Sequence, residues 1–146
     1  MGVTIAQRAE RHGGDPLFVP DLMERAIAEI NDLKPDLVVC SGDLTTFGFQ
    51  EEYVQAKRYL DRIECESLVV VPGNHDSRNV GYVHLEELIG ERSSVVRKAG
   101  TTVVAVDSTE PDLDHGHSWL CRDGGIEEQF AAEPSDVRIF VLHHHL

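Results

Sequence analysis

The sequence is poor in cysteine, in basic residues and in long apolar runs. Its three cysteines, Cys40, Cys65 and Cys121, are odd in number and unevenly spaced, which excludes a disulfide framework and a thiolate zinc site. No basic region followed by an apolar run marks a signal peptide, and no apolar stretch approaches the length of a membrane span. We therefore expect reduced thiols in a cytoplasmic protein without a membrane segment.

Basic side chains are outnumbered two to one, because 13 lysines and arginines stand against 26 acidic residues and give a formal net charge of -13. The acidic residues are spread along the chain rather than gathered in a tail. Such a surface repels polyanions, so nucleic acid is not expected as a partner. The length of 146 residues, with 41% hydrophobic content, predicts one globular domain over residues 1–146.

Five short apolar runs rich in β-branched residues predict buried strands. They cover residues 3–6, 37–40, 68–71, 102–106 and 137–142. Apolar residues at helical spacing predict helices near residues 19–33 and 49–62, and a further helix is expected near 126–132. This order predicts an α/β fold with a mainly parallel sheet and helices on both faces. Active residues are then expected at the carboxyl ends of the strands, and Asp107–Gly125 is expected to be a long surface loop.

Polar side chains of the metal-binding kind follow most of these runs. Ser41-Gly42-Asp43 follows one run, Pro72-Gly73-Asn74-His75-Asp76 follows the next, and His143-His144-His145 follows the last. Glu10 and His12 come a few residues after the first run. Carboxylate, amide oxygen and neutral imidazole together suit divalent manganese, iron or zinc. The sequence therefore predicts a metal site at the strand ends.

These motifs resemble those of the calcineurin-like metallophosphoesterases, and within that family the class III cyclic nucleotide phosphodiesterases, over nearly the whole chain. The resemblance implies a four-layer α/β/β/α sandwich around a centre of two divalent metal ions. By position, Asp43 would bridge the two metals, and Asn74 and His143 would complete the second metal site. Glu10 and His12 would serve the first metal site.

The resemblance also implies a reaction. A metal-bridging hydroxide would attack phosphorus in line, while His75, oriented by Asp76, stabilises or protonates the leaving oxygen. The substrate would be a small phosphomonoester or phosphodiester, with cyclic nucleotides and glycerophosphodiesters as the leading candidates. The acidic surface agrees with a small ester rather than with a nucleic acid.

Two departures from the family pattern leave other interpretations open. Glu10 stands where the family has Asp, and no G-H-x-H motif follows the last strand before Leu146, because His115-Gly116-His117 lies in the wrong chain order. The chain would then be a truncated or decayed copy that binds metal weakly and has no significant catalysis. Its unpaired sheet edge would make it associate with itself. A DNA-processing nuclease of the same superfamily is a further interpretation, which the acidic charge disfavours.

The candidate residues also have ordinary structural interpretations. Gly73-Asn74-His75-Asp76 is a typical turn sequence, and three histidines are typical of a purification-tag remnant. The apolar strand before Gly73-Asn74-His75-Asp76 favours a functional role over an ordinary turn. The apolar strand before the three histidines favours a native strand end over a tag remnant. Alternation along the strand puts His143 and His145 on one side and His144 on the other and does not choose among the three, whereas the resemblance favours His143. Asp107 and Ser108 are expected to cap a loop through hydrogen bonds.

Overall fold

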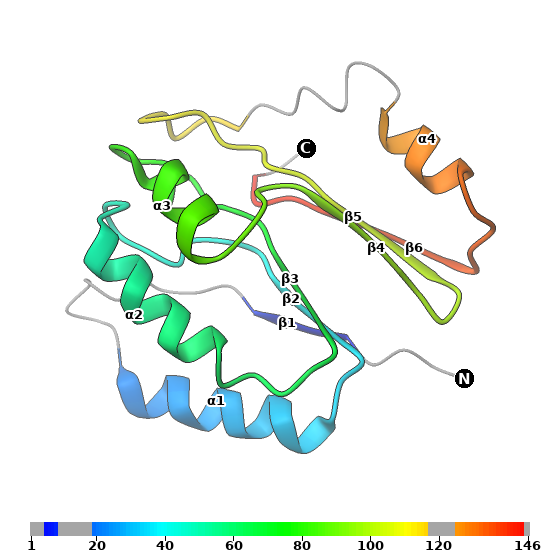
Figure 1. The fold of residues 1–146 in the computed structure, drawn as a ribbon, viewed down its shortest axis with the longest axis horizontal. Coiled ribbons are helices and arrows are strands. Elements are labelled where there is room, and N and C mark those ends of the chain that lie inside the picture. The colour runs from blue at the N-terminus through cyan, green and yellow to red at the C-terminus, as the bar shows by residue number, and fades with distance from the viewer. Residues whose placement is uncertain (1–4, 9–18, 117–124, 145–146) are drawn as a thin grey trace.

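The computed structural model describes residues 5–8, 19–116 and 125–144. The strands are β1 Ile5–Arg8, β2 Leu37–Cys40, β3 Ser67–Val70, β4 Ser94–Lys98, β5 Thr101–Ala105 and β6 Val137–Val141. The helices are α1 Pro20–Leu33, α2 Gln50–Leu60, α3 Gly81–Leu88 and α4 Gly125–Ala131. Of the helices in these ranges, none is long and apolar enough to cross a membrane. The strands form two sheets, and the helices lie outside them (Figure 1).

The first sheet is parallel and has the order β1-β2-β3. In its middle strand, Val38 lies opposite Ala6 of β1 and opposite Leu68 of β3. All four residues of β2 are buried, as expected for a parallel strand that is covered on both faces. Because the strands are parallel, their carboxyl ends lie at the same end of the sheet, where the candidate residues follow.

Helices α1, α2 and α3 lie on the side of the first sheet that faces away from the second sheet (Figure 1). In α1 the buried residues Met23, Ile27 and Ile30 recur at helical spacing. The buried residues of α2 are Tyr53 and Leu60. Side chains from α2, α3 and the adjoining strands form one core cluster, which consists of Cys40, Leu44, Tyr53, Leu60, Val70 and Leu85. These helices thereby hold the loops that follow β2 and β3.

The second sheet has the order β4-β5-β6, with β4 antiparallel and β6 parallel to β5. Every residue of β5 is buried. The two sheets pack face to face through a core cluster that draws on both of them. It consists of Leu37, Val39, Val69, Val71, Val103, Ala105 and Val141. Helix α4 contacts β5 from the outer side, which completes the layers α/β/β/α (Figure 1).

The predicted α/β fold and its four layers are confirmed, with two elements added. The strands are divided between two sheets, so each sheet has helices on one face only and the other sheet on its second face. The sequence analysis missed β4, whose five residues include Ser94, Arg97 and Lys98. It also missed α3, which has eight residues and a weak apolar pattern. Short elements with mixed polarity give little periodic signal.

Strand β6 lies at the edge of the second sheet and pairs with β5 within the described ranges. An edge strand presents backbone donors and acceptors to other chains, and Val137 of this strand is 47% exposed. Self-association through a sheet edge therefore stays a prediction. Sedimentation velocity tests it, and a monodisperse monomer at high concentration would contradict it.

Candidate functional site

Three loops meet at the carboxyl ends of β2, β3 and β6. They carry Asp43, Asn74 and His143, in that order along the chain. Residues far apart in the sequence become neighbours here: His143 bonds to Ser41, 102 positions earlier. The predicted gathering of candidate residues at strand ends is thus seen for these three loops.

Two glycines let the loops after β2 and β3 touch. Gly42 has a φ of +98°, and a Cβ at this position would lie 2.4 Å from the backbone nitrogen of Gly73. A Cβ on Gly73 would in turn lie 2.1 Å from Asp43 Oδ1. Real Cβ atoms do not approach other atoms this closely, so only glycine fits at both positions. Direct contact between the two backbones therefore places Asp43 beside the second loop.

Side-chain atoms of His143, Asn74 and Asp43 converge on one point. The Nδ1–H of His143 donates to the Ser41 carbonyl oxygen at 2.8 Å, because a carbonyl only accepts. The Nε2 of His143 then lies 3.2 Å from Asn74 Oδ1 and 3.6 Å from Asp43 Oδ1. In the neutral ring this Nε2 carries a lone pair, so three electron-rich atoms face one another. Such a group is stable around a cation, which is either a proton on Nε2 or a metal ion.

The donor atoms present fit a divalent metal ion. One imidazole nitrogen, one carboxylate oxygen and one amide oxygen form the mixed set that manganese, iron and zinc accept. In the part of the chain that the structure describes, no group of three or more His, Cys, Asp and Glu side chains is placed for a metal ion; the third donor here is the amide of Asn74. The predicted ligands Glu10 and His12 lie outside the described residues.

His75 contacts one of these three atoms, Asp43 Oδ1. Its backbone amide donates to Asp43 Oδ1 at 3.3 Å, and its ring Nδ1 donates to the carbonyl oxygen of Thr46 at 3.0 Å. This bond assigns a proton to Nδ1, so Nε2 carries the lone pair of the neutral ring. The prediction that Asp76 orients this ring is wrong, because the Thr46 carbonyl holds the ring nitrogen and Asp76 has other partners.

Asp76 is instead a buried link between the loops after β2 and β3. Its side chain is fully buried, and its carboxylate accepts from the amides of Thr45, Gly73 and Leu44 at 2.8, 2.9 and 3.1 Å. The Thr45 hydroxyl donates a fourth hydrogen bond at 2.9 Å. Burial raises the pKa of Asp76, and the four hydrogen bonds oppose this rise because they stabilise the carboxylate. The backbone carbonyl of Asp76 also accepts from the Tyr53 hydroxyl at 2.7 Å.

Arg78 and Asp114 are two site residues that the sequence analysis missed. Arg78 donates from one terminal nitrogen to the Thr46 carbonyl at 3.2 Å and from the other to Asp114 Oδ1 at 3.2 Å. The same Asp114 oxygen accepts from Asn74 Nδ2 at 2.9 Å, which turns the Asn74 amide oxygen toward His143. Hydrogen bonds from Asn74 and Arg78 lower the pKa of Asp114. The position of Arg78 in the turn after Asn74 could have identified it as a site residue. No feature of the sequence points to Asp114.

The neighbours of His143 on the second sheet have structural contacts. Ser108 Oγ lies 2.8 Å from His144 Nδ1, and the ring of His144 meets that of His143 edge-on, with 5.1 Å between centroids. Asp107 Oδ1 accepts from both the amide and the hydroxyl of Thr109 at 2.7 Å. The expected loop cap at Asp107 is therefore confirmed.

The His115-Gly116-His117 segment is described only in part. Gly116 packs on the ring of His144, because a Cβ at Gly116 would lie 2.3 Å from His144 Cγ. His117, Trp119 and His145 lie outside the described residues. Within the described part, this segment is a loop, as the sequence analysis expected.

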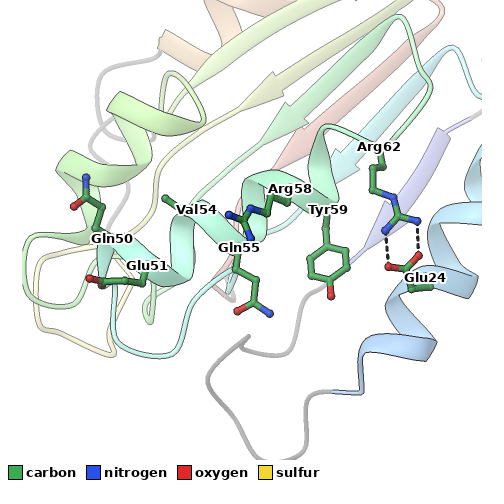
Figure 2. A pocket seen from close by; sticks show the side chains of 8 residues that line it. All are labelled: Glu24, Gln50, Glu51, Val54, Gln55, Arg58, Tyr59 and Arg62. Atoms are coloured by element: carbon green, nitrogen blue, oxygen red, sulfur yellow. Dashed lines mark hydrogen bonds and ion pairs between the residues drawn. The ribbon is translucent and has the colours of Figure 1, made fainter.

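A separate groove runs along α2 and reaches α1 (Figure 2). Its volume is about 660 Å³, and the residues that line it are Glu24, Gln50, Glu51, Val54, Gln55, Arg58, Tyr59 and Arg62. Arg62 forms a two-pronged ion pair with Glu24 at one end of it. None of the residues that converge at the strand ends lines this groove, so it is not part of the candidate site.

Comparison with known proteins shows the family of this chain. The family model described as calcineurin-like phosphoesterase matches residues 14–146. A probable cyclic nucleotide phosphodiesterase of Synechococcus is 28% identical over 133 residues, which cover 82% of this chain and 48% of that protein. The cAMP/cGMP dual specificity phosphodiesterase of Mycobacterium tuberculosis is 26% identical over 132 residues, or 85% and 42% of the two chains. The glycerophosphodiester phosphodiesterase GpdQ of Enterobacter lignolyticus is 29% identical over 129 residues, or 81% and 45%.

The chain therefore spans less than half the length of these three relatives. The family model, in contrast, covers the chain from residue 14 to residue 146. On this match, the chain belongs to the calcineurin-like phosphoesterase family.

Proposed function

We propose that this chain carries the catalytic centre of a metal-dependent hydrolase of small phosphate esters. The observation that carries the proposal is the convergence of His143 Nε2, Asn74 Oδ1 and Asp43 Oδ1 at the joined strand ends. A metal ion held by these three atoms would offset the repulsion between their lone pairs. Family membership supplies the class of reaction, and the donor atoms supply the physical reason for a metal ion.

Two divalent ions, manganese, iron or zinc, are the proposed cofactors. Asp43, Asn74 and His143 would hold one of them, and Glu10 with His12 would add ligands for the other, with Asp43 shared between the two. When bound, such a pair supplies positive charge against the phosphate and lowers the pKa of the attacking water.

His75 is the proposed general acid. The Thr46 carbonyl holds its ring at Nδ1, and the His75 amide donates to Asp43 Oδ1. A protonated ring therefore carries its second proton on Nε2, at the edge turned away from the Thr46 carbonyl. Donation of this proton to the leaving oxygen prevents the build-up of an alkoxide.

The proposed substrate is a small phosphodiester or phosphomonoester. The relatives are named as phosphodiesterases of cyclic nucleotides or of glycerophosphodiesters. The net charge of -13 also favours a small ester over a polyanion such as DNA. A small substrate reaches a site in an acidic protein with less electrostatic repulsion.

Manganese-dependent hydrolysis of bis-(p-nitrophenyl) phosphate tests the proposal, together with bound metal measured by elemental analysis. Asp43→Ala and Asn74→Ala are expected to lower the rate by about 100-fold or more, because each removes a group that positions the reacting centre. Both variants should also lose bound manganese. Asp61→Ala is the control, since Asp61 is exposed at the end of α2 and pairs with Lys57.

The two measurements separate the alternatives. Activity that both substitutions abolish supports the hydrolase. Manganese content near zero in the wild-type chain, with no turnover, would contradict the proposal and favour the truncated or decayed copy. Tight binding of single-stranded DNA at moderate salt would instead favour the nuclease.

A further inference from the structure

The segment Asp107–Gly116 connects the second sheet to the loop that carries Asn74. It leaves β5 and runs toward α3, as the yellow trace in Figure 1 shows. The amide of Asn79 donates to Asp112 Oδ1 at 2.7 Å, and the hydroxyls of Ser77 and Thr109 are hydrogen-bonded to each other. The segment is therefore anchored on both sides of its turn.

The tip of this segment places one acidic oxygen at the candidate metal site. Asp114 Oδ1 accepts from Asn74 Nδ2 at 2.9 Å and from the Arg78 guanidinium at 3.2 Å. Donors on two residues thus meet at a single anionic oxygen.

The Arg78 guanidinium is held in place independently of Asp114. The second terminal nitrogen of Arg78 donates to the Thr46 carbonyl at 3.2 Å, and the same carbonyl accepts from His75 Nδ1 at 3.0 Å. Arg78 is half-buried, with 29% of its side chain exposed. The guanidinium is therefore fixed beside His75 by a backbone atom, and its planar fork suits the oxygens of a phosphate.

The Asp114 carboxylate, in contrast, is easy to displace. Its side chain is 73% exposed, so water screens its ion pair with Arg78. A phosphate group offers more oxygens and more charge to the same donors than one carboxylate oxygen does. An anion that also meets a cation at the metal site would compete well for this position.

We infer that Asn74 Nδ2 and the Arg78 guanidinium form a binding subsite for a phosphate oxygen of the substrate, and that Asp114 fills this subsite until substrate displaces it. This inference rests on the proposed function, because it assigns a place to the phosphate group of the same reaction. It makes Arg78 a substrate-binding residue and Asp114 an internal competitor. Phosphate esters with a charged non-bridging oxygen are the ligand class.

Inorganic phosphate is the probe, measured by calorimetry with manganese present and as a competitive inhibitor of bis-(p-nitrophenyl) phosphate hydrolysis. Asp114→Asn and Asp114→Ala are expected to bind phosphate about two- to fivefold more tightly, the change for loss of a weak exposed ion pair. Arg78→Gln is expected to bind it about tenfold or more weakly, because it loses a charge-assisted hydrogen bond. In the double variant, Asp114→Asn should no longer improve binding.

Asp112→Asn is the matched control, since Asp112 lies two positions earlier on the same segment and bonds to Asn79 rather than to Asn74 or Arg78. Its phosphate affinity is expected to equal that of the wild type. Arg78→Lys keeps the charge and loses the planar fork, so its phosphate affinity should lie between those of the wild type and Arg78→Gln. This graded result would show that the loss in Arg78→Gln does not come from a folding defect.

Two results would overturn the inference. One is phosphate binding that weakens in Asp114→Asn, since Asp114 would then assist the site rather than compete for it. The other is phosphate binding that is unchanged in Arg78→Gln. A chain that binds phosphate through Arg78 but never hydrolyses an ester would support this subsite while refuting the proposed function. Normal ester hydrolysis, with phosphate binding unchanged by substitution of Arg78 or Asp114, would support the proposed function while refuting this subsite.

Discussion

Replacement of Asp76 by Asn tests whether this buried acid is a structural link or a partner of His75. The substitution keeps the shape of the side chain and exchanges one acceptor oxygen for an NH2 donor. Both oxygens of Asp76 face donors in the structure: Oδ1 accepts from the amide and hydroxyl of Thr45, and Oδ2 accepts from the amides of Leu44 and Gly73. An Asn side chain has one acceptor oxygen, so it can accept from the two donors at one of these positions and not from the two donors at the other.

The structure sets the size of the expected loss. In the less costly orientation the new NH2 faces Thr45, whose hydroxyl can accept, and one buried backbone N–H loses its partner. An unsatisfied buried donor costs about 1–3 kcal/mol, and a neutral acceptor weakens the two remaining bonds by about 1 kcal/mol each. Removal of a buried charge offsets part of this loss. We expect the free energy of unfolding to fall by about 2–4 kcal/mol, which lowers Tm by about 6–12 °C.

Scanning calorimetry of Asp76→Asn and wild type measures this change in Tm. Asp61→Asn is the control, because Asp61 is exposed at the end of α2 and pairs only with Lys57 across one helical turn in the contacts described; its Tm should stay within about 2 °C of the wild type. The pH profile of ester hydrolysis by Asp76→Asn should keep its wild-type midpoints, although the rate falls. An unchanged Tm together with a displaced pH profile would refute the structural role and restore Asp76 as the partner of His75.

Two further substitutions test the packing around this link. Tyr53→Phe removes the hydroxyl that donates to the Asp76 carbonyl, so the free energy of unfolding should fall by about 1–2 kcal/mol in thermal denaturation. Burial and the charge of Asp76 raise the pKa of Tyr53 above its ordinary 10.0, so wild-type stability should decline as pH rises above 10, where the unfolded chain loses this proton. Equal alkaline slopes for wild type and Tyr53→Phe would contradict that assignment. Gly42→Ala places a Cβ 2.4 Å from the Gly73 nitrogen and should lower both Tm and bound manganese. Gly90→Ala is the control, because at a φ of +148° with no atom within 4 Å of the Cβ it carries backbone strain alone and should keep its metal. Equal metal contents in the two variants would count against the close approach of the loops.

The sequence predicted the parts of the fold that depend on local pattern. Short β-branched runs located β2 and β3. All four residues of β2 are buried, as expected for a strand covered on both faces, whereas β3 is buried at Val69 and Val70. Parallel pairing then places the residues after those strands at one end of the sheet, which is why Asp43 and Asn74 could be assigned to one site. The structure adds a close contact between the two loops, which requires glycine at Gly42 because a Cβ there would meet the backbone of Gly73.

Contacts between backbone atoms and distant side chains could not be predicted in this way. The partners of Asp76 are mainly amide groups, which every residue except proline carries, so nothing in the sequence points to them. Asp114 contacts Asn74 across 40 positions, and its segment has no periodic pattern that would place it over the site. The assignment of Asp76 to His75 came from the family resemblance, and the structure instead gives Asp76 backbone partners in the two loops.

The Thr46 carbonyl explains how Asp76 still acts on the site without touching His75. Asp76 fixes the amides of Leu44 and Thr45 directly before Thr46, and the Thr46 carbonyl then holds the His75 ring at 3.0 Å. A loss of the Asp76 carboxylate therefore loosens the atom that orients the ring, but it leaves that ring with a carbonyl as its hydrogen-bond partner. This chain of contacts predicts a lower rate from a misplaced His75 rather than a change in its protonation. The buried acid would thus serve catalysis through the backbone that it holds in place, which is why Asp76→Asn should change Tm and rate together and leave the pH midpoints where they are.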